Sequence, residues 1–193
     1  MSVPDTSDLN ATQVRISITG GIWKAPTGTA VPSDADPFAA LNAAFTNLGY
    51  ISDDGVTESF DDSSDDVIAW QNAVTVRSST TQSTVSLEFM AIETKGFVLA
   101  TFHRGSTITN VADGIWKLPV VPVVSDRAIW VLDAIDGTVY ERSVIGAGEV
   151  VERGEVENLS GGAKGYPMTL RCYPDANGVL MNKYSNDPAW GYS

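Results

Sequence analysis

Apolar and polar residues alternate along much of this chain, and a period of two is typical of half-buried β-strands. Over 14–18, valine and isoleucine occupy every second position, which predicts a strand. The range 85–91 shows the same alternation and predicts another strand, with Val85, Leu87 and Phe89 on its buried face. The pattern therefore predicts a mainly β protein.

The C-terminal half is expected to be mostly antiparallel sheet, because strand patterns there flank residues that favour turns. A glycine at a two-residue turn supplies the positive φ that tight hairpins need. Two hairpins are predicted: 127–135 with 138–145 around Asp136-Gly137, and 166–173 with 179–184 around 174–178.

Helices are expected to be the minority. The range 36–48 predicts one, because Asp36 can cap it, Pro37 suits its first turn, and Gly49 can end it. Its apolar residues recur on one helical face. The range 92–103 predicts a second helix, with a strand as the open alternative because it holds β-favouring residues.

An acidic segment without a basic residue covers 49–70. Because like charges repel, we expect a long, exposed loop or hairpin that either stays solvated or docks on a partner. Its acidic residues are Asp53, Asp54, Glu58, Asp61, Asp62, Asp65 and Asp66.

The formal net charge of -12 excludes a protein that grips phosphate backbones. The polar, acidic start indicates no signal peptide, and no apolar run is long enough to span a bilayer, so we expect no membrane contact. The single cysteine, Cys172, fits a reducing compartment and a buried strand position.

The sequence contains few of the residues that catalytic and metal-binding sites need. His103 is the only histidine, so a nucleophile would have one base available, and a Cys/His zinc site cannot be filled. Phosphate-binding glycine motifs are missing. Carboxylates of the acidic segment lack calcium-loop spacing. We predict no enzyme, no cofactor and no metal.

A hexapeptide recurs with one change, as GIWKAP at 21–26 and GIWKLP at 114–119. We interpret the repeat as two strand ends with similar packing requirements. Trp23 and Trp116 are then expected to be packing anchors, that is, side chains that hold the strand end against the core, and Trp70 is expected to be a third.

Five phrases, taken in order, resemble the major tail tube proteins of long, non-contractile phage tails. They are APTGTAVP at 25–32, LGYISDDGVTES at 48–59, IAWQ at 68–71, STVSLEFMAIET at 83–94 and GYPMTLRCYPDANG at 165–178. His103-Arg104-Gly105 departs from the aromatic-glycine ending that is usual in the family, and this bears on the helix expected at 92–103.

The resemblance implies one tail-tube domain over 1–193, an antiparallel β-sandwich or half-barrel with one or two short flanking helices. Six copies would close into a ring, and rings would stack around a channel that DNA passes without specific binding. The long loop 49–70 would reach the next ring, and an N-terminal arm (1–12) and a C-terminal tail (185–193) would make further contacts. Candidate lumen-facing residues are Glu88, Asp61 and Asp65.

The implied partners are other copies of the chain, together with tape measure, tail terminator and baseplate proteins. The implied location is the virion tail, after synthesis in the host bacterial cytoplasm. Two other classes stay open: a head-tail joining or capsid decoration protein, and a carbohydrate-binding module that uses Trp70, Trp130 or Trp190. A joining protein would stop at one ring.

Overall fold

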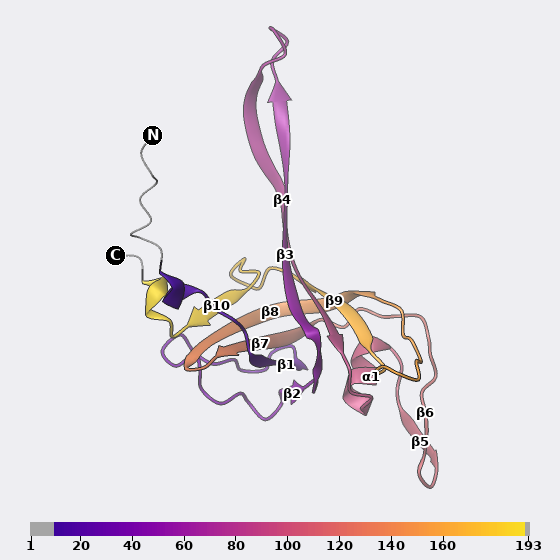
Figure 1. Ribbon diagram of the computed structural model, residues 1–193. Coiled ribbons are helices and arrows are strands. Elements are labelled where there is room, and N and C mark those ends of the chain that lie inside the picture. The colour runs from indigo at the N-terminus through magenta and orange to yellow at the C-terminus, as the bar shows by residue number, and fades with distance from the viewer. Residues whose placement is uncertain (1–9, 192–193) are drawn as a thin grey trace.

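A computed structural model describes residues 10–191 and is built mainly from antiparallel strands (Figure 1). This confirms the predicted fold class. The elements are β1 (Thr19–Pro26), β2 (Thr46–Asn47), β3 (Ile51–Ile68), β4 (Thr75–Ala91), α1 (Gly96–Phe102), β5 (Thr109–Ala112), β6 (Ile115–Lys117), β7 (Ala128–Asp136), β8 (Val139–Arg153), β9 (Tyr166–Cys172), β10 (Asn182–Ser185), and two 3-10 turns at Ala11–Gln13 and Pro188–Trp190.

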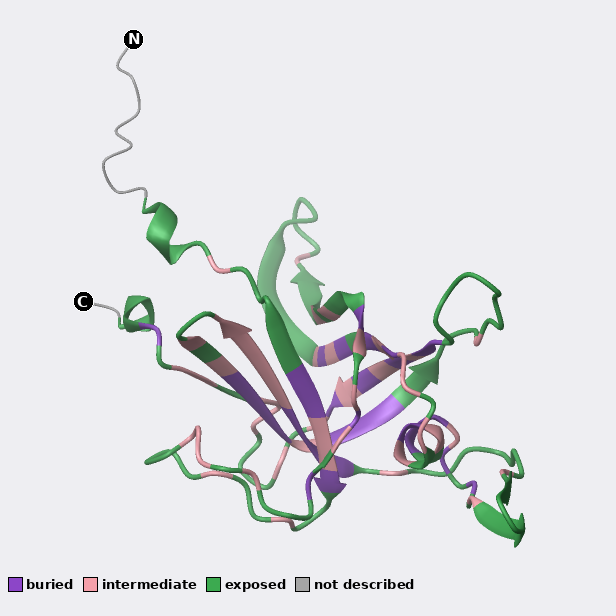
Figure 2. Cartoon of the chain, turned by 60° about the horizontal axis from the view of Figure 1, so that its bottom comes forward, coloured by how far each residue is buried: buried purple, intermediate pink, exposed green. Residues whose placement is uncertain are grey.

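The main sheet runs in the order β2-β1-β7-β8-β9-β4-β3, with β10 also paired to β8, and β5 pairs with β6 separately. Its two faces carry separate cores, because successive residues of a strand point to opposite sides. Trp130 lies in the larger core with residues of β4, β9 and α1, whereas its neighbours Ile129 and Val131 lie in a smaller one. Figure 2 shows the buried residues alternating along the strands of the body.

The hairpin predicted around Asp136-Gly137 is confirmed as β7 and β8. Asp136 pairs with Val139, so Gly137 and Thr138 form the turn, and Gly137 has the positive φ of 61°. The strand predicted at 85–91 is also confirmed, as the inner part of β4, and its alternate residues are buried. Cys172 is buried at the end of β9, as expected.

The predicted pairing of 166–173 with 179–184 is wrong, because β10 pairs with β8 and not with β9. The turn between them does form: the Asp175 side chain accepts hydrogen bonds from the backbone N–H groups of Asn177 and Val179. Beyond that turn the chain does not fold back. Instead, β9 and β10 follow one another along the same edge of β8.

The helix predicted at 36–48 is absent, and the segment is a series of turns that ends in β2. Two asparagines offer the backbone an alternative to helical bonds. Asn42 accepts from the N–H of Ala44 and Asn47 from that of Gly49. In addition, Arg142 binds the carbonyl oxygens of Pro37 and Ala39 from outside, at 3.1 and 2.9 Å.

Two other predicted ranges are only partly correct. The helix expected at 92–103 forms, but α1 covers seven residues, from Gly96 to Phe102. The strand expected at 14–18 does not form, since β1 begins at Thr19 and Val14, Ile16 and Ile18 are exposed. Of the expected N-terminal arm only residues 10–12 are described, and residues 192–193 of the expected tail likewise lie outside the described part.

Candidate assembly surfaces

The acidic segment is one strand of a long hairpin that stands away from the body (Figure 1). β3 pairs with β4 from Val56 opposite Phe89 outward to Ile68 opposite Thr75. The hairpin was one of the two forms expected for 49–70, and its second strand is rich in serine and threonine. Since an isolated two-stranded hairpin is marginally stable in water, this projection is suited to binding another surface.

The base of the hairpin is fixed by Glu93. Its carboxylate accepts a hydrogen bond of 2.8 Å from the backbone N–H of Tyr50, and it forms an ion pair with Lys95 at 3.1 Å. The Tyr50 N–H and Lys95 lower the pKa of the Glu93 carboxyl below its usual value. The charged state that holds the hairpin base is therefore favoured at neutral pH.

The strand register divides the acidic residues between two faces. Thr57 lies opposite Glu88, and Asp61, four residues outward, lies on that same face. Asp65 continues the two-residue spacing along β3, beyond a register shift between Ser63 and Ser64 that adds its extra residue to β4. Glu58, Asp62 and Asp66 lie on the other face, where Glu58 forms an ion pair with Lys183. Asp53 and Asp54 lie within the register shift between Ile51 and Val56 at the hairpin base, and Asp54 lies 3.4 Å from the Ser52 hydroxyl.

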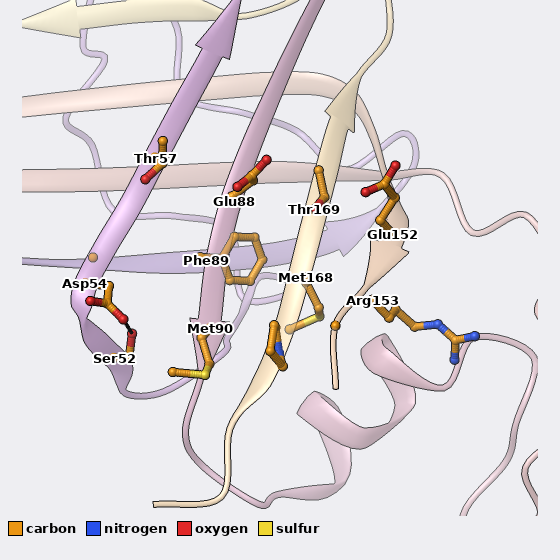
Figure 3. A pocket seen from close by; sticks show the side chains of 13 residues that line it. Ser52, Asp54, Thr57, Glu88, Phe89, Met90, Glu152, Arg153, Met168 and Thr169 are labelled. Carbon is orange, nitrogen blue, oxygen red and sulfur yellow. Dashed lines mark hydrogen bonds between the residues drawn. The ribbon is translucent and has the colours of Figure 1, made fainter. Parts of the chain in front are cut away.

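The Glu88 face continues across the sheet. Thr57, Glu88, Thr169 and Glu152 come from four neighbouring strands and form one row, which lines a shallow hollow of about 350 Å³ (Figure 3). Two carboxylates in one open row resemble the pair of an acid-base enzyme only superficially, because both side chains are exposed to solvent. The row is a polar, acidic surface.

The tip of the hairpin, in contrast, is apolar. Its exposed fractions are 56% for Val67, 61% for Ile68, 95% for Trp70, 55% for Val74 and 62% for Val76. We call these five residues the hairpin tip. Asn72 and Ala73 connect the strands with positive φ angles of 58° and 51°, which few non-glycine residues adopt.

The expected packing anchors are only partly in place. Trp23 packs against the smaller core, but Trp70 and Trp116 are not anchors within the subunit, being 95% and 67% exposed. Both stand on two-stranded hairpins, and within residues 10–191 no second layer covers them. The central tryptophan is Trp130, fully buried in the continuous apolar run of β7, which was the available signal for it.

The opposite end of the body carries a second projection and a hollow. In Figure 1 the β5–β6 hairpin, with Trp116, points away from the β3–β4 hairpin, and β1, β2 and α1 lie at the end of the body far from the hairpin tip. A hollow of about 510 Å³ lies between the end of β1 and α1. We call it the β1–α1 hollow; it includes Lys24, Ala25, Pro26, Phe97, Arg127 and Ala128.

A buried ion network supports one wall of this hollow. The Glu149 carboxylate accepts bonds of 2.6 Å from Arg104, 3.2 Å from the Ser125 hydroxyl and 3.2 Å from the backbone N–H of Asp126. Arg127 follows directly, and its guanidinium lies 4.0 Å from the ring centre of Tyr173. The Arg127 side chain is 52% exposed, so its positive charge is accessible from solvent.

Within residues 10–191, the side chains that could act in catalysis or bind a metal do not lie together in one site. Burial and the nearby charges of Arg153 and Lys164 lower the pKa of His103, so the imidazole is neutral at physiological pH. Within residues 10–191 no three metal-binding side chains lie together. Across the same residues, every helix is too short or too polar to cross a bilayer.

The tryptophans proposed for a sugar-binding module do not form one platform. Trp130 is fully buried in the core, so it offers no face to a sugar ring. Trp70 stands on the hairpin tip, whereas Trp190, 49% exposed, lies in the 3-10 turn near the C-terminal end. A carbohydrate platform needs neighbouring aromatic faces, and this arrangement supplies isolated ones.

No curated protein matches the chain. A family model described as "Phage tail tube protein" matches residues 7–193, nearly the whole sequence. The chain therefore belongs to the phage tail tube protein family.

Proposed function

We propose that this chain forms the tube of a long, non-contractile phage tail, in which six copies close into a ring and the rings stack around a channel for DNA. Membership of the family makes it a structural subunit that assembles into the tail tube of the virion with other tail proteins. The tape measure, tail terminator and baseplate proteins are the partners we expect, with no cofactor and no catalysis.

The observation that carries this proposal is the β3–β4 hairpin, a long acidic projection with solvent on both faces and an apolar tip. The main sheet also ends in open strand edges within the described residues: β3 is the last strand on one side, and the two-residue β2 covers little of β1 on the other. Exposed edges pair readily with other chains. A head-to-tail interface whose rotation closes makes a ring.

The acidic Glu88 face is our proposed channel wall, with Asp61 and Asp65 on the hairpin continuing it. The strand pairing supports this proposal, because Asp61 and Asp65 share the two-residue spacing of Thr57, the partner of Glu88, and Glu152 joins the row from β8. A wall of this sign repels DNA phosphates, so a genome slides past each ring instead of binding to it. The net charge of -12 extends that repulsion over the whole subunit.

The acidic hairpin is also our proposed contact between rings, and neutralising it tests this role. A variant with Asp53, Asp54, Asp61 and Asp62 replaced by asparagine should fold normally, because all four side chains are exposed. It should stack poorly, because the charges that meet a cationic surface of the next ring are gone. Rod length in electron micrographs is the measurement.

A matched control removes four exposed charges elsewhere, with the changes Asp36→Asn, Asp113→Asn, Glu155→Gln and Glu157→Gln. Both variants lose the same net charge, so a difference between them reports position and not overall repulsion. Rods of normal length from the hairpin variant would refute the docking role of these carboxylates. A single ring that never stacks, formed by the unmodified chain, would instead favour a head-tail joining protein.

A further inference from the structure

The hairpin tip is the part of the contact surface that charge does not explain. Its five residues are 55% to 95% exposed and lie at the end of the acidic strand β3, in the turn and at the start of β4. Monomeric proteins rarely leave a contiguous apolar patch in water without a use for it. Tryptophan is also the residue type most enriched where interfaces gain their binding energy.

We propose that the hairpin tip of one subunit binds the β1–α1 hollow of a second copy, with Trp70 as the side chain that enters it. This rests on the proposed tube function and names the receiving site for the hairpin. The hollow, at about 510 Å³, lies within the size range of ligand-binding clefts and is large enough to admit an indole ring. Ala25, Pro26, Phe97 and Ala128 give it apolar walls.

Charge complementarity identifies a second copy as the occupant. The hairpin from Ile51 to Ala91 holds eight acidic residues and one basic residue. The hollow carries Lys24 and Arg127 against the single carboxylate of Asp126, in a protein whose overall charge is strongly negative. Asp126 already pairs with Lys24, and Glu149, the nearest carboxylate to Arg127 among the described residues, is 3.9 Å away and bound by Arg104. Arg127 therefore keeps donors for an incoming carboxylate.

The placement of the two surfaces agrees with stacking. The hairpin tip lies at one end of the molecule, and β1, β2 and α1 lie toward the other (Figure 1). Because the tip and the hollow lie at opposite ends, they cannot contact one another within one subunit. Repeated between copies, they make a head-to-tail contact, which extends along an axis.

The first test replaces Trp70 by alanine, with Trp116→Ala on the other exposed hairpin as the matched control. Neither change should move the melting temperature, because both side chains are largely exposed. Trp70→Ala should raise the protein concentration needed for rod formation at least about 30-fold, the equivalent of about 2 kcal/mol for an interface hot spot. Trp116→Ala should change it much less.

The second test locates the receiving site by cross-linking. A Gln71→Cys subunit, which keeps Trp70 and carries its cysteine on the adjacent exposed residue, is mixed with an Ala44→Cys subunit, because Ala44 is exposed and lines the hollow. Oxidation of the mixture under assembly conditions should give covalent dimers, whereas Trp116→Cys mixed with Ala44→Cys should give none. Cys172 is buried in β9 and does not compete.

The outcomes separate this proposal from the tube function itself. Rods that form at the same concentration with Trp70→Ala, together with no dimer from the cysteine pair, would overturn the docking site and leave the tube function standing. A tip that serves another tail protein or a host molecule would give that same result. If the unmodified chain forms neither rings nor rods, the proposed tube function itself is refuted, whatever the Trp70 variants do.

Discussion

Replacing Glu149 by glutamine removes the charge at the centre of the network behind the β1–α1 hollow. Arg104 and Glu149 form an ion pair whose side chains are 7% and 11% exposed, and the Ser125 hydroxyl and the Asp126 N–H donate to the same carboxylate. Glutamine keeps the shape and one acceptor oxygen. It leaves the Arg104 guanidinium buried without its counter-charge.

The magnitude follows from that burial. Removing one partner of a buried ion pair typically costs about 3–5 kcal/mol. A neutral hydrogen bond from glutamine to Arg104 recovers about 1 kcal/mol. We therefore expect Glu149→Gln to lower the free energy of unfolding by about 2–4 kcal/mol, or the melting temperature by about 10 °C for a chain of this size.

Urea unfolding followed by tryptophan fluorescence measures this directly, because Trp130 is buried beside the network and donates to the carbonyl of Gly148. Glu152→Gln, three residues along the same strand and exposed, is the control and should be nearly neutral. Combining Arg104→Met with Glu149→Met should cost less than the two single changes added together. A loss below about 1 kcal/mol for Glu149→Gln would refute the assigned role of the ion pair.

Three further predictions concern the subunit alone. Gly137→Val should lower the free energy of unfolding by about 1–3 kcal/mol, because its φ of 61° strains a branched residue, whereas Gly161→Val, in open space, should not. Burial raises the pKa of Cys172 to about 11, so the thiol of the folded protein should not react with Ellman's reagent at pH 8 and should react only in denaturant. Rapid reaction of the folded protein with the reagent would contradict the burial of Cys172. The Ala189 N–H and Arg15 lower the pKa of Asp187, so its stabilisation is present above the unfolded pKa and is lost as pH falls toward the folded one. Asp187→Asn should therefore melt below the wild type at neutral pH and match it in strong acid; a gap that stays constant with pH would argue otherwise.

Local pattern was sufficient where a strand's partner is its neighbour in sequence. The hairpin of β7 and β8 needs only Gly137 at the turn and strand-forming apolar residues on both sides. The buried face of β4 likewise follows from every second residue over 85–91. Even the long β3–β4 hairpin is a local event, and the acidic run at 49–70 correctly indicated its exposure.

The sequence-based prediction failed where residues far away in the sequence determine the local structure or the strand partner. The range 36–48 has helical spacing, but Arg142, about a hundred positions away, binds its carbonyl oxygens, and Asn42 and Asn47 form local turns. The strand at 182–185 joins β8, a partner that spacing cannot indicate. The GIWK repeat shows the limit plainly: Trp23 packs on a core and Trp116 faces solvent, in nearly the same sequence.

The candidate surfaces divide in the same way. Acidic residues of the hairpin could be named from composition, because a dense run of one charge rarely enters a core. The β1–α1 hollow could not, because its walls come from β1, from the turn before β2, from α1 and from the start of β7. No single stretch of sequence carries a signal for such a site.

Electron microscopy of the purified chain at high concentration tests the central claim most directly. The account predicts hollow rods built from stacked rings of six subunits, formed without added ligand. Protein that stays monomeric under every condition, together with its absence from the shafts of assembled tails, would contradict it.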